Sequence, residues 1–335
     1  MDIQNKKLLA LIESFPQKKI AVWGDFILDE YLYGTTRRIS REAPVLILSY
    51  KNKEFALGGA GNSLLNLKAL GAEPLPIGVV GNDEPGEKIL KMLSQREIPA
   101  SALIKDKSCQ TPVKTRILAG EPTTRKQQIL RIDREEKIPD SKLLQQKLLK
   151  ELKNILPQAE ALLISDYNYY TVKESIFRSV FPYFIRKKIP VTVDTRFRLI
   201  NFKGITAVTP NEPEVEWALK IELNDNLSLL KQAGKTILQK IKAQALLITR
   251  GSKGMVLFEP NKAPFFIPIY GTTDIVDVTG AGDTVISVFT LALASGATFK
   301  EAALLANYAG GIVVMKKGTA TLTRAELKKA VESRN

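Results

Sequence analysis

Histidine is absent from this chain of 335 residues, and cysteine occurs once, at Cys109. Without histidine, the chain excludes a Ser-His-Asp triad, a Cys-His pair and any histidine-ligated metal site. General-base chemistry must therefore come from a carboxylate, a lysine, a tyrosine or the one thiol. A single cysteine forms neither an internal disulfide nor a cysteine zinc site, and this suits a reducing compartment.

Long hydrophobic runs are missing as well. The longest candidate, residues 285–294, is about half the length that crosses a bilayer. Charged residues interrupt the apolar positions of the first segment, MDIQNKKLLALIESFPQKK, too often for a secretory signal. We therefore expect a cytoplasmic protein that does not interact with a membrane.

Acidic residues are fewer than basic ones, 35 against 49, so the formal net charge is +14. The basic residues are scattered and do not form a stripe with aromatic residues between them, so we expect no nucleic-acid partner. Two interpretations remain for the excess charge. One is a solvated basic surface, and the other is a site for a small polyanionic substrate.

Short apolar strands alternate with helical patterns through most of the chain. Residues 19–23 (KIAVW) indicate a buried strand, and residues 62–70 indicate a helix that Gly71 ends. This alternation predicts an α/β fold with helices on both faces of a mostly parallel sheet. Because the chain contains no Gly/Ser linker and no repeat, we expect residues 1–335 to form a single domain. Further strands are predicted at 76–80, 161–165, 190–194, 207–209, 245–249, 255–258 and 264–267, and further helices at 86–93, 172–187, 227–241, 282–294, 300–315 and 324–333, with another starting near residue 212.

Two segments, residues 33–57 and 111–133, depart from this pattern. They alternate apolar and polar residues and leave no room for helices, so VLILSYK, TPVKTRIL and QQILRID predict antiparallel strands. A small sheet inserted in the first half of the core can cover an active site or pair with another subunit. We expect a β lid that does both, in a homodimer.

The sequence DVTGAGDT, residues 277–284, carries the strongest chemical signal and directly precedes an apolar helical run. Its glycines allow backbone N–H groups to face an anion at a helix N-terminus, where the helix dipole adds positive charge. Asp283 in the same turn can accept the proton of an attacking hydroxyl, so the motif suits phosphorylation of a hydroxyl. In the alternative interpretation, Asp283 only caps the helix. The spacing matches neither a dinucleotide fingerprint nor a P-loop.

Two weaker motifs also precede helices. In GGAGN, residues 58–62, glycines permit close approach of a ligand and the Asn62 amide can bind sugar hydroxyls; a plain tight connection would look the same. In NEPE, residues 211–214, proline and acidic residues favour a helix start. Alternatively, Asn211 and Glu214 hold a phosphate and Mg²⁺ through water.

In combination, GGAGN, NEPE and DVTGAGDT resemble the PfkB/ribokinase family of sugar kinases, and the resemblance extends from residue 24 to residue 321. It implies a ribokinase-like three-layer sandwich with a mostly parallel central sheet and a small antiparallel β lid. It also implies an ATP-dependent phosphotransferase that uses Mg²⁺.

Within the family, GDFILDEYLYGTTRRISREAP, KTRIL, QQILRID and ANYAGGIVVMKKGTAT look most like D-glycero-β-D-manno-heptose 7-phosphate kinases. Those enzymes phosphorylate the anomeric hydroxyl to give the 1,7-bisphosphate in the synthesis of lipopolysaccharide precursors. Many are fused to a nucleotidyltransferase domain with an HxGH motif, so a chain without histidine is similar to the stand-alone kinase form. The alternatives are another kinase of this family, acting on a neutral sugar, a fructose phosphate or a nucleoside, and a non-catalytic sugar- or nucleotide-binding regulator.

The resemblance also implies roles for individual residues. Asp283 matches the catalytic base, and the amides of Gly280, Ala281 and Gly282 match the anion hole. Asp277 and Thr279 match positions that coordinate a monovalent cation such as K⁺ in some members. The positions that match the nucleotide pocket are Asn211, Glu214 (which also holds Mg²⁺ through water), Thr249, Gly251 and Asn307. The positions that match the sugar site are Asp25, Asp29, Gly59 and Asn62.

A substrate that already carries a phosphate needs a cationic pocket away from the transferred phosphate. Lys114, Arg116 and Arg131 on the predicted lid, and Arg196 after a core strand, are the candidates, and we expect two or more to meet the 7-phosphate. Alternatively, they are ordinary surface cations. For Asp283 we expect a weak base, because the helix dipole favours its charged form.

Overall fold

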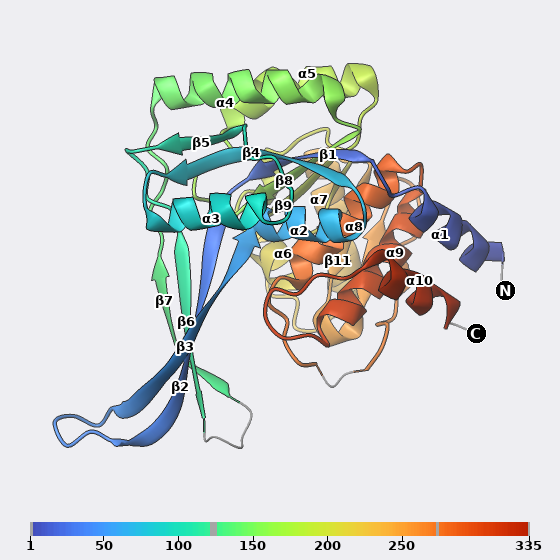
Figure 1. Cartoon of the computed structure of the whole chain (residues 1–335). Helices are drawn as coiled ribbons and strands as arrows, with labels where there is room; N and C mark the ends of the chain where they lie inside the picture. The colour runs from blue at the N-terminus through green and yellow to red at the C-terminus, as the bar shows by residue number, and fades with distance from the viewer. Residues whose placement is uncertain (1–2, 121–125, 273–274, 334–335) are drawn as a thin grey trace.

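The computed structural model describes residues 3–120, 126–272 and 275–333, and within them it contains a large and a small β-sheet (Figure 1). In the large sheet, β1 pairs in parallel with β4 and β8, whereas β12 runs antiparallel to β11 and β13. The prediction of a mostly parallel sheet is confirmed. In spatial order the strands are β13 (Phe265–Ile267), β12 (Met255–Phe258), β11 (Ala245–Thr249), β10 (Ala207–Val208), β9 (Val191–Thr195), β8 (Ala161–Asp166), β1 (Lys19–Gly24), β4 (Glu73–Gly81) and β5 (Leu103–Asp106).

Helices cover both faces of the large sheet. Successive side chains of a strand point to opposite faces, so Ile20 and Val22 of β1 join one hydrophobic core while Ala21 and Trp23 join the other. The result is the predicted three-layer sandwich. The first core includes side chains from α1 (Ile3–Glu13), α2 (Ala60–Ala69), α3 (Glu84–Ser94), α8 (Ala281–Ala294), α9 (Phe299–Val313) and α10 (Arg324–Glu332). The second includes side chains from α4 (Lys142–Ile155), α5 (Glu174–Lys187), α6 (Glu212–Leu219) and α7 (Leu227–Ile241).

The small sheet projects from the core as a long twisted ribbon (Figure 1). Its strand order is β3 (Leu46–Gly59), β2 (Phe26–Ile39), β6 (Val113–Gly120) and β7 (Gln127–Arg134). The predicted second insert also contains residues 121–125, which lie outside the described residues. We refer to these four strands as the lid.

The lid differs from its prediction in two ways. The β2–β3 and β6–β7 pairs are antiparallel as expected, but the central β2–β6 pair is parallel. The reason is that β2 follows β1 and β6 follows β5, and these core strands point the same way, so both lid strands leave the core in one direction. In addition, β2 starts at Phe26, one residue beyond Asp25, well before the predicted boundary at residue 33.

Three elements, α1, α4 and β5, were not predicted. Helix α4 has a clear signal, because Leu144, Leu148 and Leu152 recur every four residues and are buried.

Helix α1 packs against α10, so the two ends of the chain lie on the same side of the molecule (Figure 1). Among the helices in the described part of the chain, none has the length and apolar character needed to cross a membrane.

Candidate active site

The carboxyl ends of β1, β8 and β9 meet the N-terminus of α8 at one edge of the large sheet, beside the base of the lid (Figure 1). Loops that follow parallel strands gather at this edge, which is where open α/β sheets bind ligands. The predicted residues Asp25 and Arg196 follow β1 and β9, and Asp283 lies in the first turn of α8.

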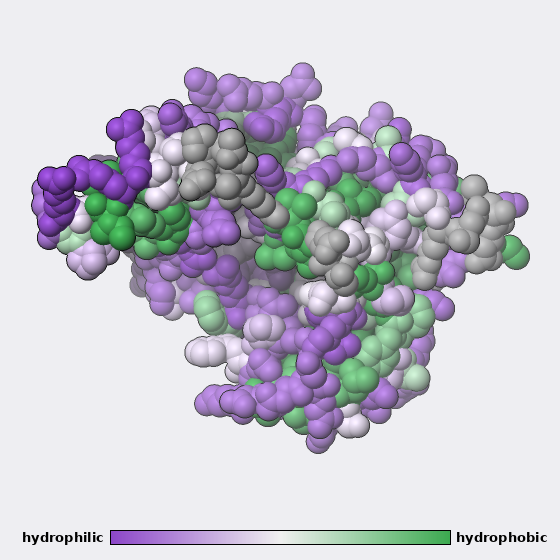
Figure 2. Space-filling view, turned by 90° about the horizontal axis from the view of Figure 1, so that it is seen from below, coloured by the Kyte–Doolittle hydropathy of each residue, from purple (hydrophilic) through white to green (hydrophobic). Residues whose placement is uncertain are grey.

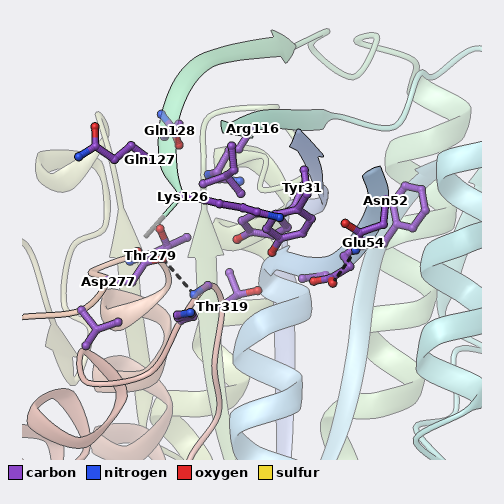
Figure 3. Close-up of a pocket in the computed structure, with 17 residues that line it drawn as sticks. Tyr31, Asn52, Glu54, Arg116, Lys126, Gln127, Gln128, Asp277, Thr279 and Thr319 are labelled. Carbon is purple, nitrogen blue, oxygen red and sulfur yellow. Dashed lines mark hydrogen bonds between the residues drawn. The ribbon is translucent and has the colours of Figure 1, made fainter. Parts of the chain in front are cut away.

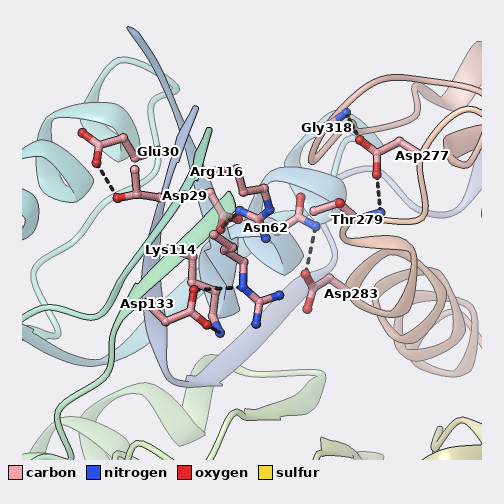
Figure 4. Close-up of polar contacts among 12 residues, drawn as sticks. Asp29, Glu30, Asn62, Lys114, Arg116, Asp133, Asp277, Thr279, Asp283 and Gly318 are labelled. Carbon is pink, nitrogen blue, oxygen red and sulfur yellow. Dashed lines mark hydrogen bonds and ion pairs between the residues drawn. The ribbon is translucent and has the colours of Figure 1, made fainter. Parts of the chain in front are cut away.

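Both carboxylate oxygens of Asp283 accept a hydrogen bond, each from a different element. Asn62 Nδ2 on α2 donates to Oδ2 at 2.9 Å (Figure 4), and the Tyr167 hydroxyl donates to Oδ1 at 3.0 Å. Only 3% of Asp283 is exposed. The sequence motifs GGAGN and DVTGAGDT therefore meet in space, although Asn62 and Asp283 are 221 residues apart.

Burial, with a contribution from the nearby Asp194 carboxylate, raises the pKa of Asp283 to about 7, although the hydrogen bonds from Asn62 and Tyr167 oppose the shift. The expectation of a weak base is therefore wrong. The helix dipole acts on Asp283, but removal of the carboxylate from water has the larger effect. A carboxylate with a pKa near 7 is a suitable general base at neutral pH.

A second layer of amide and hydroxyl groups supports Asn62. Asn66 Nδ2 donates to the Asn62 carbonyl oxygen at 3.0 Å, and the Thr284 hydroxyl donates to Asn66 Oδ1 at 3.1 Å. These groups are fully buried, so their polar atoms need such partners. The network fixes the amide that faces Asp283.

The glycine turn before α8 has the predicted geometry for close approach. Gly280 has φ +78°, and a Cβ there would lie 2.4 Å from Asn62 Nδ2, so a side chain does not fit. Of the three amides expected in the anion hole, that of Ala281 donates to the Val278 carbonyl at 3.2 Å. The Gly280 and Gly282 amides have no such backbone partner among the described residues, and their role in binding an anion stays a prediction.

Asp25 holds a loop. Its carboxylate accepts backbone N–H bonds from Tyr167 at 2.8 Å, Tyr169 at 3.0 Å and Thr171 at 3.1 Å, and only 1% of the residue is exposed. Burial and the neighbouring Asp166 raise its pKa to about 6. These three bonds account for Asp25, and its direct contact with a sugar stays a prediction.

Gly59 lies where α2 meets this loop. Its φ is +58°, and a Cβ would lie 2.6 Å from the Asp25 carbonyl and 3.3 Å from the Tyr167 ring. Glycine at this position therefore allows α2, β1 and the Tyr167 loop to meet.

Three of the four predicted phosphate-binding cations already have carboxylate partners. Arg116 binds Asp29 at 2.6 Å (Figure 4), and burial raises the pKa of Asp29 even with this partner present. The remaining contacts are Lys114 with Glu135 at 2.8 Å and with Asp133 at 3.6 Å, and Arg131 with Asp133 at 2.9 Å.

Arg196 differs from these three because the described residues provide it with no ion pair. Its guanidinium lies 4.9 Å from the centre of the Tyr167 ring, and the residue is exposed. Among the four candidates, Arg196 is therefore the cation most available to an incoming anion.

The NEPE motif starts α6 with a capping box. The Asn211 side chain accepts from the Glu214 amide at 2.8 Å, and Glu214 Oε2 accepts from the Asn211 amide at 2.9 Å, so the structural interpretation of this motif is confirmed. Burial raises the pKa of Glu214 to about 7, and burial with the Glu214 charge raises the pKa of Asp194 well above its usual range. Two carboxylates that oppose each other's ionisation leave a position that a cation would stabilise.

The other predicted nucleotide residues lie around this motif. Thr249 forms a parallel bridge with Asn211, so both sit at the ends of neighbouring strands. Gly251 has φ +55° and faces open space. The amide of Asn307, on α9, donates to the Pro268 carbonyl at 2.9 Å, so this donor is already engaged.

Asp277 and Thr279 belong to a turn that holds two loops together. Asp277 Oδ1 accepts from the Thr279 amide and Oδ2 from the Gly318 amide, both at 2.9 Å (Figure 4). Burial would raise the pKa of Asp277, but these amide bonds lower it below its usual value. No group of three or more Cys, Asp or Glu side chains in the described residues could hold a metal ion, and cation binding at Asp277 stays a prediction.

A cavity of about 970 Å³ separates the inner face of the lid from the core (Figure 3). Tyr31, Tyr33 and Arg116 line it on the lid side, and Asp277 and Thr319 line it on the core side. Since Arg116 also contacts Asp29, the cavity adjoins this ion pair at the base of the lid.

Several residues of this site belong to none of the motifs singled out in the sequence. Tyr167 contacts Asp283, Asp194 lies on β9 two residues before Arg196, and Glu135 binds Lys114. Asp166 binds Arg198 Nε at 2.9 Å. The available signal is position, because Asp166, Tyr167 and Asp194 lie at the ends of predicted strands.

Comparisons with known proteins identify relatives over nearly the whole chain. The family described as pfkB family carbohydrate kinase matches residues 17–326. The bifunctional protein HldE of Trichlorobacter lovleyi is 38% identical over 330 residues, which are 98% of this chain and 66% of that protein. HldE of Geobacter metallireducens is 40% identical over 307 residues, 91% of this chain and 61% of that protein. The chain thus spans somewhat less than two thirds of the length of these relatives.

Solved structures show the same fold at lower identity. Ribokinase of Arabidopsis thaliana, complexed with ribose and ATP, superposes with a TM-score of 0.72 at 20% identity, covering 95% of this chain and 99% of that one. Phosphofructokinase-2 of Escherichia coli in complex with fructose-6-phosphate gives 0.72 at 18% identity, covering 94% and 98%. The fold is ribokinase-like, and the chain belongs to the pfkB family of carbohydrate kinases, ATP-using phosphotransferases that act on sugar hydroxyls.

Proposed function

We propose that the chain phosphorylates the anomeric hydroxyl of D-glycero-β-D-manno-heptose 7-phosphate with ATP, giving the 1,7-bisphosphate. The observation that carries this proposal is Asp283, a buried carboxylate held by Asn62 and Tyr167 at the start of α8, beside a polar cleft under the lid. The heptose assignment is supported by the motifs shared with heptose 7-phosphate kinases and by 38–40% identity to HldE proteins.

Asp283 acts as the general base. The anomeric oxygen attacks the γ-phosphorus of ATP, the bond from phosphorus to the β,γ-bridging oxygen breaks, and the hydroxyl proton passes to Asp283. With a pKa of about 7, a large fraction of Asp283 is ionised at neutral pH and ready to accept this proton. Phosphoryl transfer depends mainly on positioning and on electrostatic stabilisation of the transferred group. The Gly280 and Gly282 amides, with Ala281 between them, supply this electrostatic stabilisation at the helix N-terminus.

The nucleotide lies across the ends of β10 and β11. Asn211, Thr249 and Gly251 border this region, and the Asn211–Thr249 bridge keeps two of them adjacent. Asn307 supports the pocket wall through its bond to the Pro268 carbonyl.

Glu214 would hold Mg²⁺ through water, because its partly buried carboxylate lies near that of Asp194 and both have raised pKa values. When bound, the ion neutralises phosphate charge. Asp277 and Thr279 are the proposed positions for a monovalent cation such as K⁺. The Asp277 carboxylate would then exchange an amide partner for the ion.

The sugar occupies the base of the lid, with Asp29, Gly59 and Asn62 around it and Asp25 holding the neighbouring loop. Arg196 receives the 7-phosphate, because it has an exposed guanidinium without a carboxylate partner among the described residues. Lys114, Arg116 and Arg131 contribute through the positive potential of the lid. We further propose that residues 1–335 form a single catalytic domain, that the protein works in the cytoplasm, and that it is a homodimer joined through the lid.

A coupled ADP-release assay with heptose 7-phosphate, fructose 6-phosphate, ribose and adenosine tests this function. The expected result is a kcat/KM for heptose 7-phosphate at least a hundredfold above the others, with a kcat about 10²- to 10⁴-fold lower in Asp283→Asn. A preference for a neutral sugar or a nucleoside would contradict the heptose assignment. If none of the four substrates is turned over with ATP, the alternative function, a non-catalytic sugar- or nucleotide-binding regulator, would be favoured.

A further inference from the structure

We propose that Tyr167 is a positioning residue for the reaction, whose hydroxyl fixes which face of the Asp283 carboxylate is presented to the sugar hydroxyl. This inference rests on the role of Asp283 in the proposed function. Tyr167 itself does not need to contact the substrate. It acts from a loop, residues 167–171, that the core holds in an unusual conformation.

Two buried carboxylates hold this loop. Asp25 accepts the amides of Tyr167, Tyr169 and Thr171, and Asp166 accepts the intervening amide of Asn168 at 3.1 Å. Asn168 and Tyr170 have φ of 68° and 71°. Asparagine adopts this left-handed conformation readily, but for a bulky residue such as Tyr170 it is uncommon and persists where the surrounding structure supports it. The four hydrogen bonds to Asp25 and Asp166 therefore hold the loop in one conformation.

The Tyr167 ring is confined on two sides. A Cβ added to Gly59 would lie 3.3 Å from the ring, and the Arg196 guanidinium lies 4.9 Å from its centre. From this position the hydroxyl reaches Asp283 Oδ1 at 3.0 Å, while Asn62 holds Oδ2. Since the two donors come from different elements, the carboxylate cannot rotate without breaking a hydrogen bond. Its remaining lone pairs then point in a fixed direction, towards the space in front of the α8 turn.

The charges around Asp283 give this contact a measurable signature. Asp194 and Asp29 raise the Asp283 pKa, while the hydrogen bonds from Asn62 and Tyr167 lower it. Burial raises the pKa of Tyr167 well above its usual value, with Arg196 opposing this shift, so Tyr167 remains a neutral donor. Removal of its hydroxyl should therefore raise the Asp283 pKa above 7, because the charged carboxylate loses a donor.

The first test is a titration that uses no substrate. In protein labelled with ¹³C at aspartate carboxyl carbons, Asp283→Asn assigns the Asp283 signal. We expect a midpoint near 7 in the unmodified protein and at least half a unit higher in Tyr167→Phe. Tyr170→Phe is the matched control, because this tyrosine lies in the same loop and its hydroxyl bonds Lys137 instead. Equal midpoints in Tyr167→Phe and the unmodified protein would overturn the inference.

The second test is kinetic and uses whichever sugar the unmodified protein phosphorylates. A hydrogen bond to a charged group predicts a fall in kcat of about 10- to 100-fold in Tyr167→Phe. We expect the KM for ATP to change less than about threefold. The fall should persist at pH 9, where Asp283 is ionised in both proteins. Full recovery of kcat at pH 9 would show that Tyr167 affects only protonation and would refute the positioning role. The substrate assignment fails separately, if heptose 7-phosphate is not the sugar that is used.

Discussion

At the scale of single residues, the chemistry of Asp283 follows from two opposing effects. The N-terminus of α8 favours a negative charge by roughly 0.3–2 kcal/mol. Burial opposes it and can shift a pKa by several units. Burial dominates here, because Asp283 is 3% exposed and its pKa rises to about 7. The sequence places the aspartate at a helix start but contains no information about how deeply the lid base, α2 and the Tyr167 loop enclose it.

The buried charge of Asp283 should reduce stability as the pH rises. In the unfolded chain this carboxyl ionises near pH 4, but in the folded protein it keeps its proton until about pH 7. The folded state thus binds more protons between these values, and its stability falls across that window. Asp283→Asn removes the effect. In urea unfolding, the free energy of unfolding of Asp283→Asn should equal that of the unmodified protein at pH 4 and exceed it by up to about 4 kcal/mol at pH 8. Its kcat should fall about 10²- to 10⁴-fold. A variant that is less stable than the unmodified protein at pH 8 would contradict the burial argument.

Arg196 should matter more to sugar-phosphate binding than the lid cations do. Arg196→Ala removes a cation without a carboxylate partner among the described residues, so the KM for heptose 7-phosphate should rise about 10- to 100-fold. Arg131→Ala is the matched control, because Arg131 is neutralised by Asp133 and is 47% exposed. Steady-state kinetics with each substrate varied would check this. Equal increases in the KM for ATP and for the sugar phosphate would place Arg196 at the nucleotide instead.

At the scale of elements, the contact between α2 and the Tyr167 loop depends on Gly59. Gly59→Ala should lower the free energy of unfolding by about 1–3 kcal/mol, because φ is +58° and the new Cβ would meet the Asp25 carbonyl at 2.6 Å. It should also lower kcat at least tenfold, since Asn62 and Tyr167 both move. Gly296→Ala has the same kind of backbone strain at φ +87° but meets nothing within 4 Å. We expect that control to lose stability and keep its kcat. Full activity in Gly59→Ala would argue against a fixed arrangement.

Most elements could be predicted because their signals are local. The buried strands are continuous apolar runs, and α7 and α10 show helical periodicity, so their predicted bounds lie within a residue or two of those observed. The parallel β2–β6 pairing could not be read from alternation, because it depends on the direction in which two distant segments leave the core. Tyr167 was missed for a similar reason. Its position just after the predicted strand 161–165 is a weak signal, and its meaning comes from Asp283, 116 residues away.

At the scale of the whole molecule, the lid carries a group of exposed hydrophobic side chains. Figure 2 shows hydrophobic side chains gathered towards the end of the projecting ribbon. Near the β2–β3 turn these include Ile39 at 64% exposed and Val45 at 56%. On β7, Leu130 and Ile132 are 53% and 54% exposed. Apolar side chains gathered on an extended sheet, beside a core that buries its own, indicate an interaction surface.

The register of the lid predicts how a dimer would form. Leu32 pairs with Ile117 and Ile117 with Leu130, so these three side chains share one face of the sheet, while Arg116 and Arg131 share the other. One face therefore serves the sugar site and the opposite one is apolar. A two-fold pair of lids would bury the apolar face symmetrically. Each lid would then contact the lid that covers the site of the other subunit.

The dimer can be tested on that apolar face, which is opposite the face that carries Arg116. In light scattering, we expect a mass near twice 37.1 kDa for the unmodified protein and near 37.1 kDa for the double variant Leu130→Lys, Ile132→Lys. Gln146→Lys with Lys150→Glu, two exposed positions of α4, is a matched surface control and should stay dimeric. The monomeric variant should keep its melting temperature within a few degrees, because neither side chain enters the core. Its KM for the sugar should rise, since each lid loses the partner that restricts its motion. A monomeric mass for the unmodified protein would remove the dimer, and a dimeric mass for the double variant would place the interface elsewhere.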